Sequence, residues 1–453
     1  MRSVDEHTGL EGHNQPRYKH YPYPQRLAVL SDTVKIHTLR EQGNIKRYLE
    51  AQAEIFTLSP EQARKQDKQL YAIIEWLDSS MTAIDASPRA PEKDCVVISL
   101  LAFGQAYIDK MLNYTFKSLM AFENLPCLCA ERRVTIHLQT DSESRAQVEA
   151  APITLAMKAL GVHFEYAVFP DSITATLKGD EIIYWMLGAC ASLGIHYAKS
   201  LGAAFHHSYP DIVYSNKFFS ELMRLSKEHK SILGPGMRSD ETLMLPAIKP
   251  YETAAALTIP SADLMAHHMN SLHMVAFPYV VNNRPQNWLF PHNHVLIWES
   301  ENAVHINSPH VNAWWLDYSV IKDLPARYYQ TLDSELDLIC AGEDFYIPRA
   351  GDELYQAELS PPDRASISDI YGGVQTCAQI IWRAVSSRDT LKFFIRGMKV
   401  MVNREVRPAK PGCFPEENIK AERNFLFNTL MSTDPHARVD LKRKRAHTGS
   451  LFA

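Results

Sequence analysis

The sequence has no apolar run long enough to cross a lipid bilayer. Its longest apolar stretches, at residues 182–193 and 95–103, are shorter than the ~18–20 residues that a transmembrane helix needs. Residues 1–18 are polar and mixed in charge, without the apolar core of a secretory signal. We therefore expect a cytoplasmic protein without a transmembrane segment.

Cysteine is sparse and irregularly placed. The chain has seven cysteines, at positions 95, 127, 129, 190, 340, 377 and 413. An odd number without C-x-x-C pairs disfavours both a disulfide framework and a thiolate zinc site. Reduced thiols, as in a cytoplasmic protein, are the expected state.

The chain also lacks a surplus of positive charge. The formal net charge is -5, and both signs are mixed along the sequence. This balance disfavours nucleic acid as the main partner. The one basic run, at residues 442–445, lies in a segment (433–453) that we expect to be a flexible basic tail.

Several motifs that identify enzyme classes are missing. No G-x-G-x-x-G follows the first predicted strand, and no P-loop lysine motif occurs anywhere. The patterns G-x-S-x-G and H-E-x-x-H are absent as well. These absences argue against a conventional dinucleotide site, a P-loop site, a nucleophile-elbow hydrolase and a zinc protease of that type.

Apolar strands alternate with helices between residues 94 and 236. Nearly continuous apolar runs at 95–103, 134–140, 163–169 and 203–207 are typical of strands buried on both faces of a parallel sheet. Helical spacing of apolar residues at 107–122, 153–160 and 181–201 separates these runs. The pattern predicts an α/β fold with a mostly parallel, Rossmann-like sheet and helices on both faces.

The predicted α/β domain, residues 91–350, has helical additions at both ends. We expect residues 1–20 to be disordered and residues 21–90 to form a helical N-terminal region, with Ser59 capping a helix that begins at Pro60. Residues 351–432 are predicted as a helical C-terminal region, with helices at 370–385, 390–402 and 416–431.

Asp211 is an acidic residue in a favourable position. It follows the fourth predicted strand, and ligands of parallel sheets bind beyond the carboxyl ends of the strands. A carboxylate there can hold a divalent cation that neutralises phosphate oxygens. Alternatively, Asp211 only serves a turn after Pro210, and Ser215 or Asn216 only caps the helix that begins at Lys217.

Histidines are dense between residues 267 and 310. They are His267, His268, His273, His292, His294, His305 and His310. His292 and His294 share one face if the segment is a strand, which is a spacing that can chelate a metal. Each histidine alone is more typical of a core or surface position, whereas the group as a whole could line a site.

Other residue types suited to chemistry follow. Glu335 and Asp337 alternate and are candidates for a general base, or else lie on a solvated face. Arg238 could clamp a phosphate with two hydrogen bonds or form a surface salt bridge. Six aromatic residues could stack on a sugar or a base, or belong to the core: Trp288, Trp298, Trp314, Trp315, Tyr328 and Tyr329.

The order of these elements resembles bacterial GT-A glycosyltransferase-like proteins. The resemblance rests on the strand at 96–103 with its following helix, on residues 124–126, and on the segments 136–141, 210–215 and 232–238. It covers residues 94–345 and implies transfer of a sugar from a nucleotide-sugar donor to an unknown protein, peptide or glycan acceptor, usually with Mn²⁺ or Mg²⁺ at an Asp-x-Asp motif.

Here the corresponding segment contains Asp211 alone, without an Asp-x-Asp motif. Either Asp211 works with a distant ligand, or no metal is used, or the fold has lost transferase activity. The resemblance implies three groups of site residues. They are a nucleotide-binding group (Phe103, Asp141 and Arg238), a metal-binding group (Asp211, His294 and His310) and the candidate bases Glu335 and Asp337.

Two alternatives to a glycosyltransferase remain open at this stage. The histidines could serve a metal-dependent hydrolase or oxygenase. The missing Asp-x-Asp motif is also compatible with a non-catalytic binding or assembly protein on a degenerate transferase fold. A homo-oligomer is compatible with each of these functions.

Overall fold

The computed structural model describes residues 60–87, 94–174, 180–273, 295–300, 303–307, 311–322, 345–348, 354–361 and 398–401. Several predictions lie outside these ranges, namely those for residues 1–20, for the helical stretch before residue 60, for the helices at 370–385 and 416–431, and for the tail 433–453.

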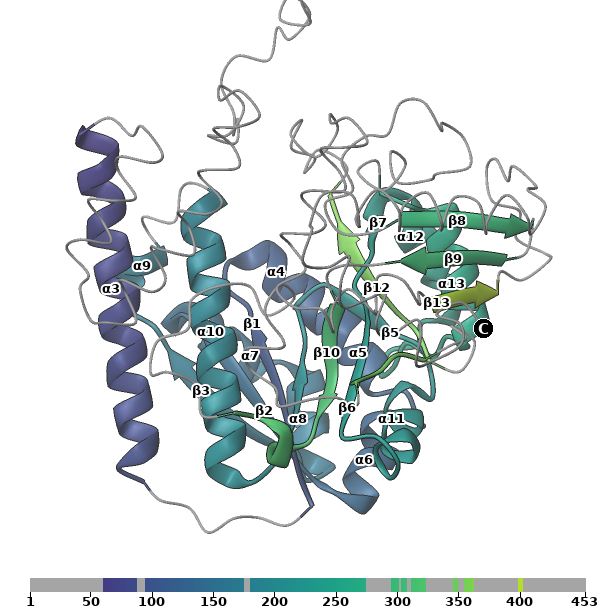
Figure 1. The fold of residues 1–453 in the computed structure, drawn as a ribbon, viewed down its shortest axis with the longest axis horizontal. Helices are drawn as coiled ribbons and strands as arrows, with labels where there is room; N and C mark the ends of the chain where they lie inside the picture. The colour runs from purple at the N-terminus through teal and green to yellow at the C-terminus, as the bar shows by residue number, and fades with distance from the viewer. Residues whose placement is uncertain are drawn as a thin grey trace, which may run out of the picture.

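A seven-stranded sheet with the order β11-β6-β10-β4-β1-β2-β3 forms the centre of the described structure (Figure 1). Its strands are β1 (Cys95–Leu101), β2 (Arg133–Thr140), β3 (His163–Val168), β4 (Ala204–His207), β6 (Ser231–Pro235), β10 (Val311–Leu316) and β11 (Phe345–Tyr346). Among the described pairings of this sheet, β10 runs antiparallel to β4 and β6, and the others are parallel. The predicted mostly parallel α/β fold is therefore confirmed.

The four strands β3-β2-β1-β4 have the order that opens a Rossmann-like sheet, with β1 between β2 and β4. Every residue of β1 is buried. Ile98 belongs to the core on one side of the sheet and Val97 to the core on the other. The continuous apolar run of β1 thus follows from burial on both faces, as the sequence predicts.

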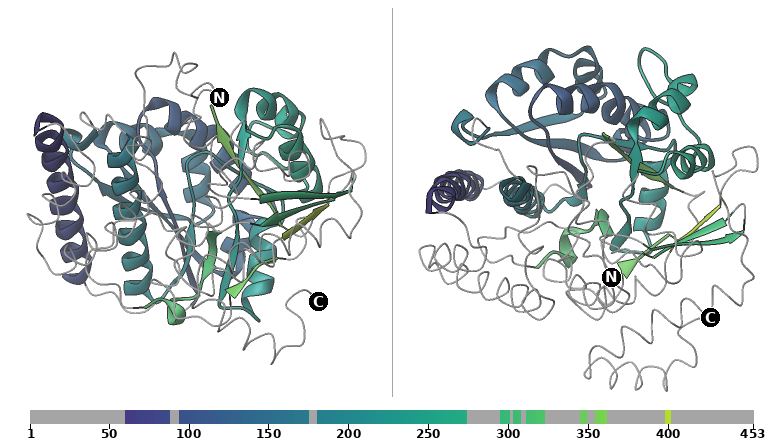
Figure 2. Two further views of the ribbon diagram at one scale, coloured as in Figure 1. Left: turned by 45° about the horizontal axis from the view of Figure 1, so that its top comes forward. Right: turned by 90° about the horizontal axis from the view of Figure 1, so that it is seen from above.

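Helices cover both faces of the sheet (Figure 2). On one face, α10 (Asp180–Leu201) packs on β1 and β4, and α3 (Pro60–Asp85) packs on α10. The other face carries α4 (Gln105–Lys110), the π-helix η3 (Met111–Thr115), α5 (Phe116–Leu119), α6 (Leu125–Glu131), α7 (Ser142–Ala150), α8 (Pro152–Ala159) and α11 (Phe218–Ser226). The remaining helical segments are α9 (Asp171–Thr174), α12 (Glu241–Ile248), η4 (Lys249–Tyr251), α13 (Ser261–Asn270) and η7 (Tyr318–Val320).

Helix prediction succeeded where the helix is apolar and failed where it is polar or short. The predicted helix at 107–122 is divided by the π-helical turn η3. Helix α7 was not predicted, because its sequence has few apolar residues to show helical spacing. The seven-residue helix α6, with Pro126 in its first turn, was also missed.

Two small sheets accompany the main one. The first has the order β5-β12-β7 and contains β5 (Ile212–Tyr214), β12 (Gln356–Ser360) and β7 (Arg238–Asp240). The second has the order β13-β9-β8 and contains β13 (Met398–Met401), β9 (Ala303–Asn307) and β8 (Val295–Ser300).

These sheets correct the prediction of a helical C-terminal region. Residues 398–401 form a strand inside the predicted helix 390–402, because they pair with β9. Residues 356–360 form β12, which hydrogen-bonds to a strand on each side. Pairing with residues far along the chain overrides the local helical spacing in both places.

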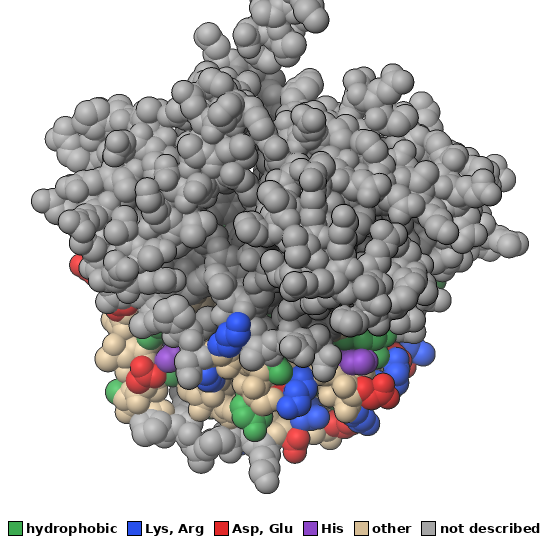
Figure 3. Space-filling view, in the orientation of Figure 1, with side chains coloured by type: hydrophobic (Ala, Val, Ile, Leu, Met, Phe, Trp, Pro, Cys, Tyr) green, Lys and Arg blue, Asp and Glu red, His purple; other side chains and the backbone are tan. Residues whose placement is uncertain are grey.

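No helix within the described ranges is long and apolar enough to cross a membrane. Figure 3 shows Lys and Arg side chains interspersed with Asp and Glu on the described part of one face. This mixture matches the balanced charge of the sequence.

Candidate functional site

The carboxyl ends of β1 and β4 meet at the point where the strand order reverses. Strands β2 and β3 follow β1 in one direction, and β4 lies on its other side. The two strand ends are joined by a hydrogen bond from the Ser208 amide to the Ser99 carbonyl oxygen, at 2.9 Å. Open α/β sheets bind ligands at such a reversal. We therefore take this edge of the sheet as the candidate site.

The loop after β1 is exposed at Gly104, where the backbone has φ +75° and an added Cβ would meet no atom within 4 Å. The Gly104 amide donates to Ser144 Oγ at 3.2 Å. Phe103, predicted to bind nucleotide, is half-buried and packs edge to face on Phe169, with ring centroids 5.6 Å apart. The ring of Phe103 therefore packs against another aromatic side chain at the carboxyl end of β1.

Asp141, also predicted to bind nucleotide, ends β2 at the same edge. Its carboxylate caps helix α7 by accepting a hydrogen bond from the Ser144 amide at 2.7 Å. The side chain is 9% exposed. Capping accounts for one carboxylate oxygen of this residue, and this structural role was not predicted.

The loop that carries Asp211 is hydrogen-bonded to two distant segments of the chain. Thr115, the last residue of the π-helix η3, donates its hydroxyl to the Pro210 carbonyl oxygen at 2.8 Å. The Leu359 amide of β12 donates to the Asp211 carbonyl oxygen at 2.8 Å. A short π-helical segment such as η3 is frequent beside functional sites. Segments far apart in the sequence therefore fix the backbone on both sides of this acid.

The alternative interpretation of Ser215 and Asn216 as helix caps is wrong. Lys217, with φ +75°, occupies the N-cap position of α11 without a side-chain capping bond. The Ser215 hydroxyl accepts a hydrogen bond from the Tyr355 backbone amide at 3.0 Å. The side-chain amide of Asn216 donates a hydrogen bond to Glu123 Oε2 at 2.7 Å. Both side chains instead join this segment to other parts of the chain.

The Asp211 side chain is 6% exposed. Burial raises the pKa of Asp211 to about 8, and the nearby Glu358 carboxylate acts in the same direction. Lys110 and Arg238 lower this pKa but do not offset the burial. Asp211 is therefore predominantly protonated at neutral pH, which distinguishes it from an exposed carboxylate.

Both basic residues near Asp211 form ion pairs. Arg238 Nε lies 3.0 Å from Glu358 Oε1, and Lys110 pairs with Glu241. Arg238 is 35% exposed in its side chain and Lys110 is 14% exposed. The sequence did not decide whether Arg238 clamps a phosphate or forms a salt bridge. The structure shows a salt bridge to Glu358, which lies on a strand 120 residues further along the chain.

A chain of buried hydrogen bonds lies beneath the loop. His206 Nδ1 is 2.6 Å from the Trp314 carbonyl oxygen, and His206 Nε2 is 2.9 Å from the Tyr214 hydroxyl. The Tyr214 hydroxyl is 2.5 Å from Ser208 Oγ. Burial lowers the pKa of His206 to about 3, so its ring is neutral. The only sequence signal for this network is a pair of histidines in an otherwise apolar strand.

The described histidines do not gather into a metal site. His268 is buried, with its pKa lowered to about 4 by burial, and its Nδ1 lies 3.1 Å from the Tyr355 hydroxyl. His273 Nε2 lies 2.8 Å from the Pro361 carbonyl oxygen. Among the residues that the structure describes, no three His, Cys, Asp or Glu side chains come together to hold a metal ion.

Four of the predicted site residues lie outside the described ranges: His294, His310, Glu335 and Asp337. Asp211 is a single oxygen ligand, and its acidic neighbour Glu358 is paired with Arg238. The described residues therefore do not make a complete divalent-cation site.

The structure thus brings Phe103, Asp141, Asp211 and Arg238 to one edge of the sheet, at the ends of β1, β2, β4 and β6. The structural contacts of Phe103 and Asp141 were not predicted from the sequence. The sequence matches no protein-family model, and no curated protein is significantly similar to it.

Proposed function

We propose that this chain is a glycosyltransferase-like enzyme that binds a nucleotide sugar at the carboxyl ends of β1 and β4. The observation that carries the proposal is the place of the Asp211 loop, which leaves β4 at the reversal of strand order.

The charges around the loop suit a diphosphate. Arg238 is partly exposed and offers a planar guanidinium that can bind two phosphate oxygens. Glu358 now holds this guanidinium, so a phosphate would have to compete with that carboxylate. Since Asp211 is predominantly protonated at neutral pH, it adds little negative charge to repel the ligand.

The proposed reaction moves a glycosyl group. The bond between the anomeric carbon and the diphosphate oxygen breaks, and the electron pair leaves with the nucleoside diphosphate. The acceptor oxygen forms the new bond to the anomeric carbon and gives its proton to a base. Glu335 and Asp337 remain the predicted bases. Arg238 would stabilise the charge on the leaving diphosphate.

Calorimetric titration of the full chain with UDP-glucose and GDP-mannose, with and without Mn²⁺, tests this proposal. The wild type should bind at least one of them, and Arg238→Gln should bind it at least about tenfold more weakly, the loss of one charge-assisted contact. Arg132→Gln is the matched control.

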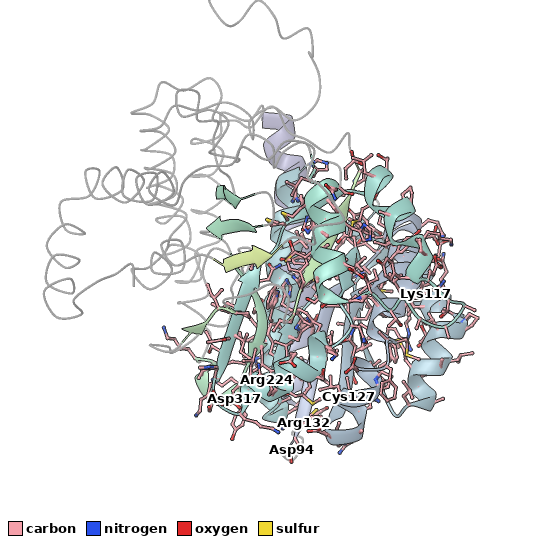
Figure 4. The ribbon with its side chains drawn as sticks, turned by 90° about the vertical axis from the view of Figure 1, so that its right-hand side faces the viewer. Asp94, Lys117, Cys127, Arg132, Arg224 and Asp317 are labelled. Carbon is pink, nitrogen blue, oxygen red and sulfur yellow. The ribbon has the colours of Figure 1, made fainter. Side chains whose placement is uncertain are left out.

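Arg132 pairs with Asp94 at 2.6 Å where β1 and β2 begin, at the opposite edge of the sheet (Figure 4). Its replacement should leave binding unchanged. Absence of binding by the wild type at millimolar concentration overturns the proposed function. Equal binding by Arg238→Gln and the wild type removes Arg238 from the site.

A further inference from the structure

Strand β3 is the last strand of the seven-stranded sheet, at the end opposite to β11 (Figure 1). Within the described ranges, β2 is the only strand that pairs with it. One long edge of β3 therefore faces away from the other strands of the sheet. An outer edge of this kind carries backbone N–H and C=O groups that can pair with a strand of another chain.

The hydrogen bonds between β2 and β3 show which residues of β3 direct their backbone groups outward. The Phe169 amide donates to the Thr140 carbonyl oxygen of β2 at 3.0 Å. In a parallel ladder, the backbone groups of alternate residues point to the same neighbouring strand. Glu165 therefore directs its backbone groups to β2, as Phe169 does, whereas Phe164 and Tyr166 direct theirs outward.

Helix α3 covers the carboxyl end of this outer edge. The Trp76 indole donates a hydrogen bond to the Val168 carbonyl oxygen at 3.1 Å. Val168 is two residues after Tyr166, so this bond agrees with the outward direction of the backbone groups at alternate positions. A partner strand must therefore pair with the first half of β3, around Phe164.

The two faces of β3 differ in their side chains. Phe164 belongs to the hydrophobic core on one side of the sheet, and Tyr166 packs against that core. His163 and Glu165 lie on the opposite face, where their side chains are 61% and 33% exposed. His163 Nε2 is 3.4 Å from Glu165 Oε2. The exposed face of the edge strand thus carries a histidine and a carboxylate two residues apart.

Two copies of β3 complement each other in the antiparallel register that places Phe164 opposite its own copy. The two copies of Phe164 exchange both of their backbone hydrogen bonds in this register. His163 of each copy then lies opposite Glu165 of the other, and opposite charges at such positions stabilise the pairing. A register centred on Glu165 would instead place two carboxylates opposite each other, which is destabilising.

We infer that the outer edge of β3 binds a second copy of this chain, in an antiparallel pairing centred on Phe164 that joins two sheets into one. Both copies use the same edge, so the contact has two-fold symmetry. The occupant is a second copy because the order of His163 and Glu165 along the strand is complementary to itself. The contact lies along the side of the sheet and does not depend on the proposed function.

Two charge-changing substitutions in the full chain test this pairing. In a dimer of Glu165→Lys, each His163 faces a lysine, and in a dimer of His163→Glu each pair contains two carboxylates. Analytical ultracentrifugation should show a dimer for the wild type and a dimer dissociation constant at least about tenfold higher for each variant. An equimolar mixture of the two variants should dimerise again, because every cross-strand pair then contains a carboxylate and a basic side chain.

Glu221→Lys is the matched control. Glu221 is 26% exposed, pairs with Arg224 at 2.6 Å and belongs to α11, which packs on β6 and β10 toward the other end of the sheet. This substitution should leave the dimer unchanged.

A wild type that is monomeric at high micromolar concentration overturns the inference. A dimer that both edge variants keep would place the contact elsewhere and also overturns it. The same conclusion follows if the mixed variants stay monomeric while each keeps the circular dichroism spectrum of the wild type. Nucleotide-sugar binding is measured separately, so failure of the dimer leaves the proposed function standing.

Discussion

Tyr214 donates its hydroxyl hydrogen to Nε2 of His206 across 2.9 Å. The direction follows from the other side of the imidazole, where Nδ1 faces the Trp314 carbonyl oxygen, which can only accept. Since His206 is neutral, Nδ1 carries the hydrogen and Nε2 accepts. The Ser208 hydroxyl then donates to the Tyr214 oxygen at 2.5 Å, which is closer than its other acceptor, the Tyr209 carbonyl oxygen at 3.3 Å. The buried chain of hydrogen bonds therefore runs in one direction, from Ser208 at the site edge to the backbone of β10.

Tyr214→Phe tests this chain. The substitution leaves His206 Nε2 and the Ser208 hydroxyl without their bonds to the phenol, and the free energy of unfolding should fall by about 1–3 kcal/mol. Urea unfolding measures the change. Tyr318→Phe, at a side chain that is 50% exposed, should stay within about 0.5 kcal/mol of the wild type. Equal stability of Tyr214→Phe and the wild type would contradict the assigned network.

Protonation of His206 should destabilise the fold in acid. Its pKa is about 3 in the folded protein and 6.5 in an exposed histidine. Between these values the unfolded chain binds more protons, so stability rises with pH and is complete above about pH 6.5. The slope for one such group is about 1.4 kcal/mol for each pH unit. Burial lowers the pKa of His268 to about 4, so His268 adds to this pH dependence in the same direction.

His206→Gln should have a lower free energy of unfolding at pH 7 but a shallower rise between pH 4.5 and 6.5, measured by urea unfolding at each pH. A His206→Gln curve parallel to the wild type would show that His206 does not titrate in this way.

Asp211 has the opposite pH dependence. The folded protein keeps its proton to about pH 8, whereas the unfolded chain releases it near pH 3.8. The folded state binds more protons in this window, so the contribution of Asp211 to stability falls as pH rises. The free energy of unfolding of Asp211→Asn should therefore exceed that of the wild type by at least about 1 kcal/mol at pH 8 and by little at pH 4.

Chemical unfolding at pH 4, 6 and 8 measures this gain. An Asp211→Asn variant that loses stability at pH 8 would show that the carboxylate is needed in its charged form.

Gly234 leaves space for the indole ring of Trp314. A Cβ at this position would lie 2.1 Å from Trp314 Cζ2, and the ring is fully buried. Gly234→Ala should lower the free energy of unfolding by about 3 kcal/mol, because the ring cannot move without displacing the core. Gly104→Ala, with open space but φ +75°, should lose about 1 kcal/mol through backbone strain. Thermal unfolding ranks the two variants, and the reverse order would contradict the packing argument.

The sequence predicts the parallel strands because burial on both faces leaves a continuous apolar run in each, as in β1. It also predicts where Asp211 lies, because that residue follows a strand. It does not show that Asp211 is buried, since burial depends on Thr115, Leu359 and other residues far away in sequence. The capping role of Asp141 was missed although Asp141-Ser-Glu-Ser has the composition of a helix start.

Contacts between distant segments explain the rest of what the sequence could not show. Arg238 forms an ion pair with Glu358, which lies in a strand that was predicted as part of a helical region.

The position of β10 between β4 and β6 also governs how the protein is made. Those two strands end at residues 207 and 235 and are synthesised first, whereas the strand between them begins only at residue 311. Until then, a nascent chain has two strands with unpaired edges, which are prone to aggregation. A product truncated before residue 311 would keep both edges open.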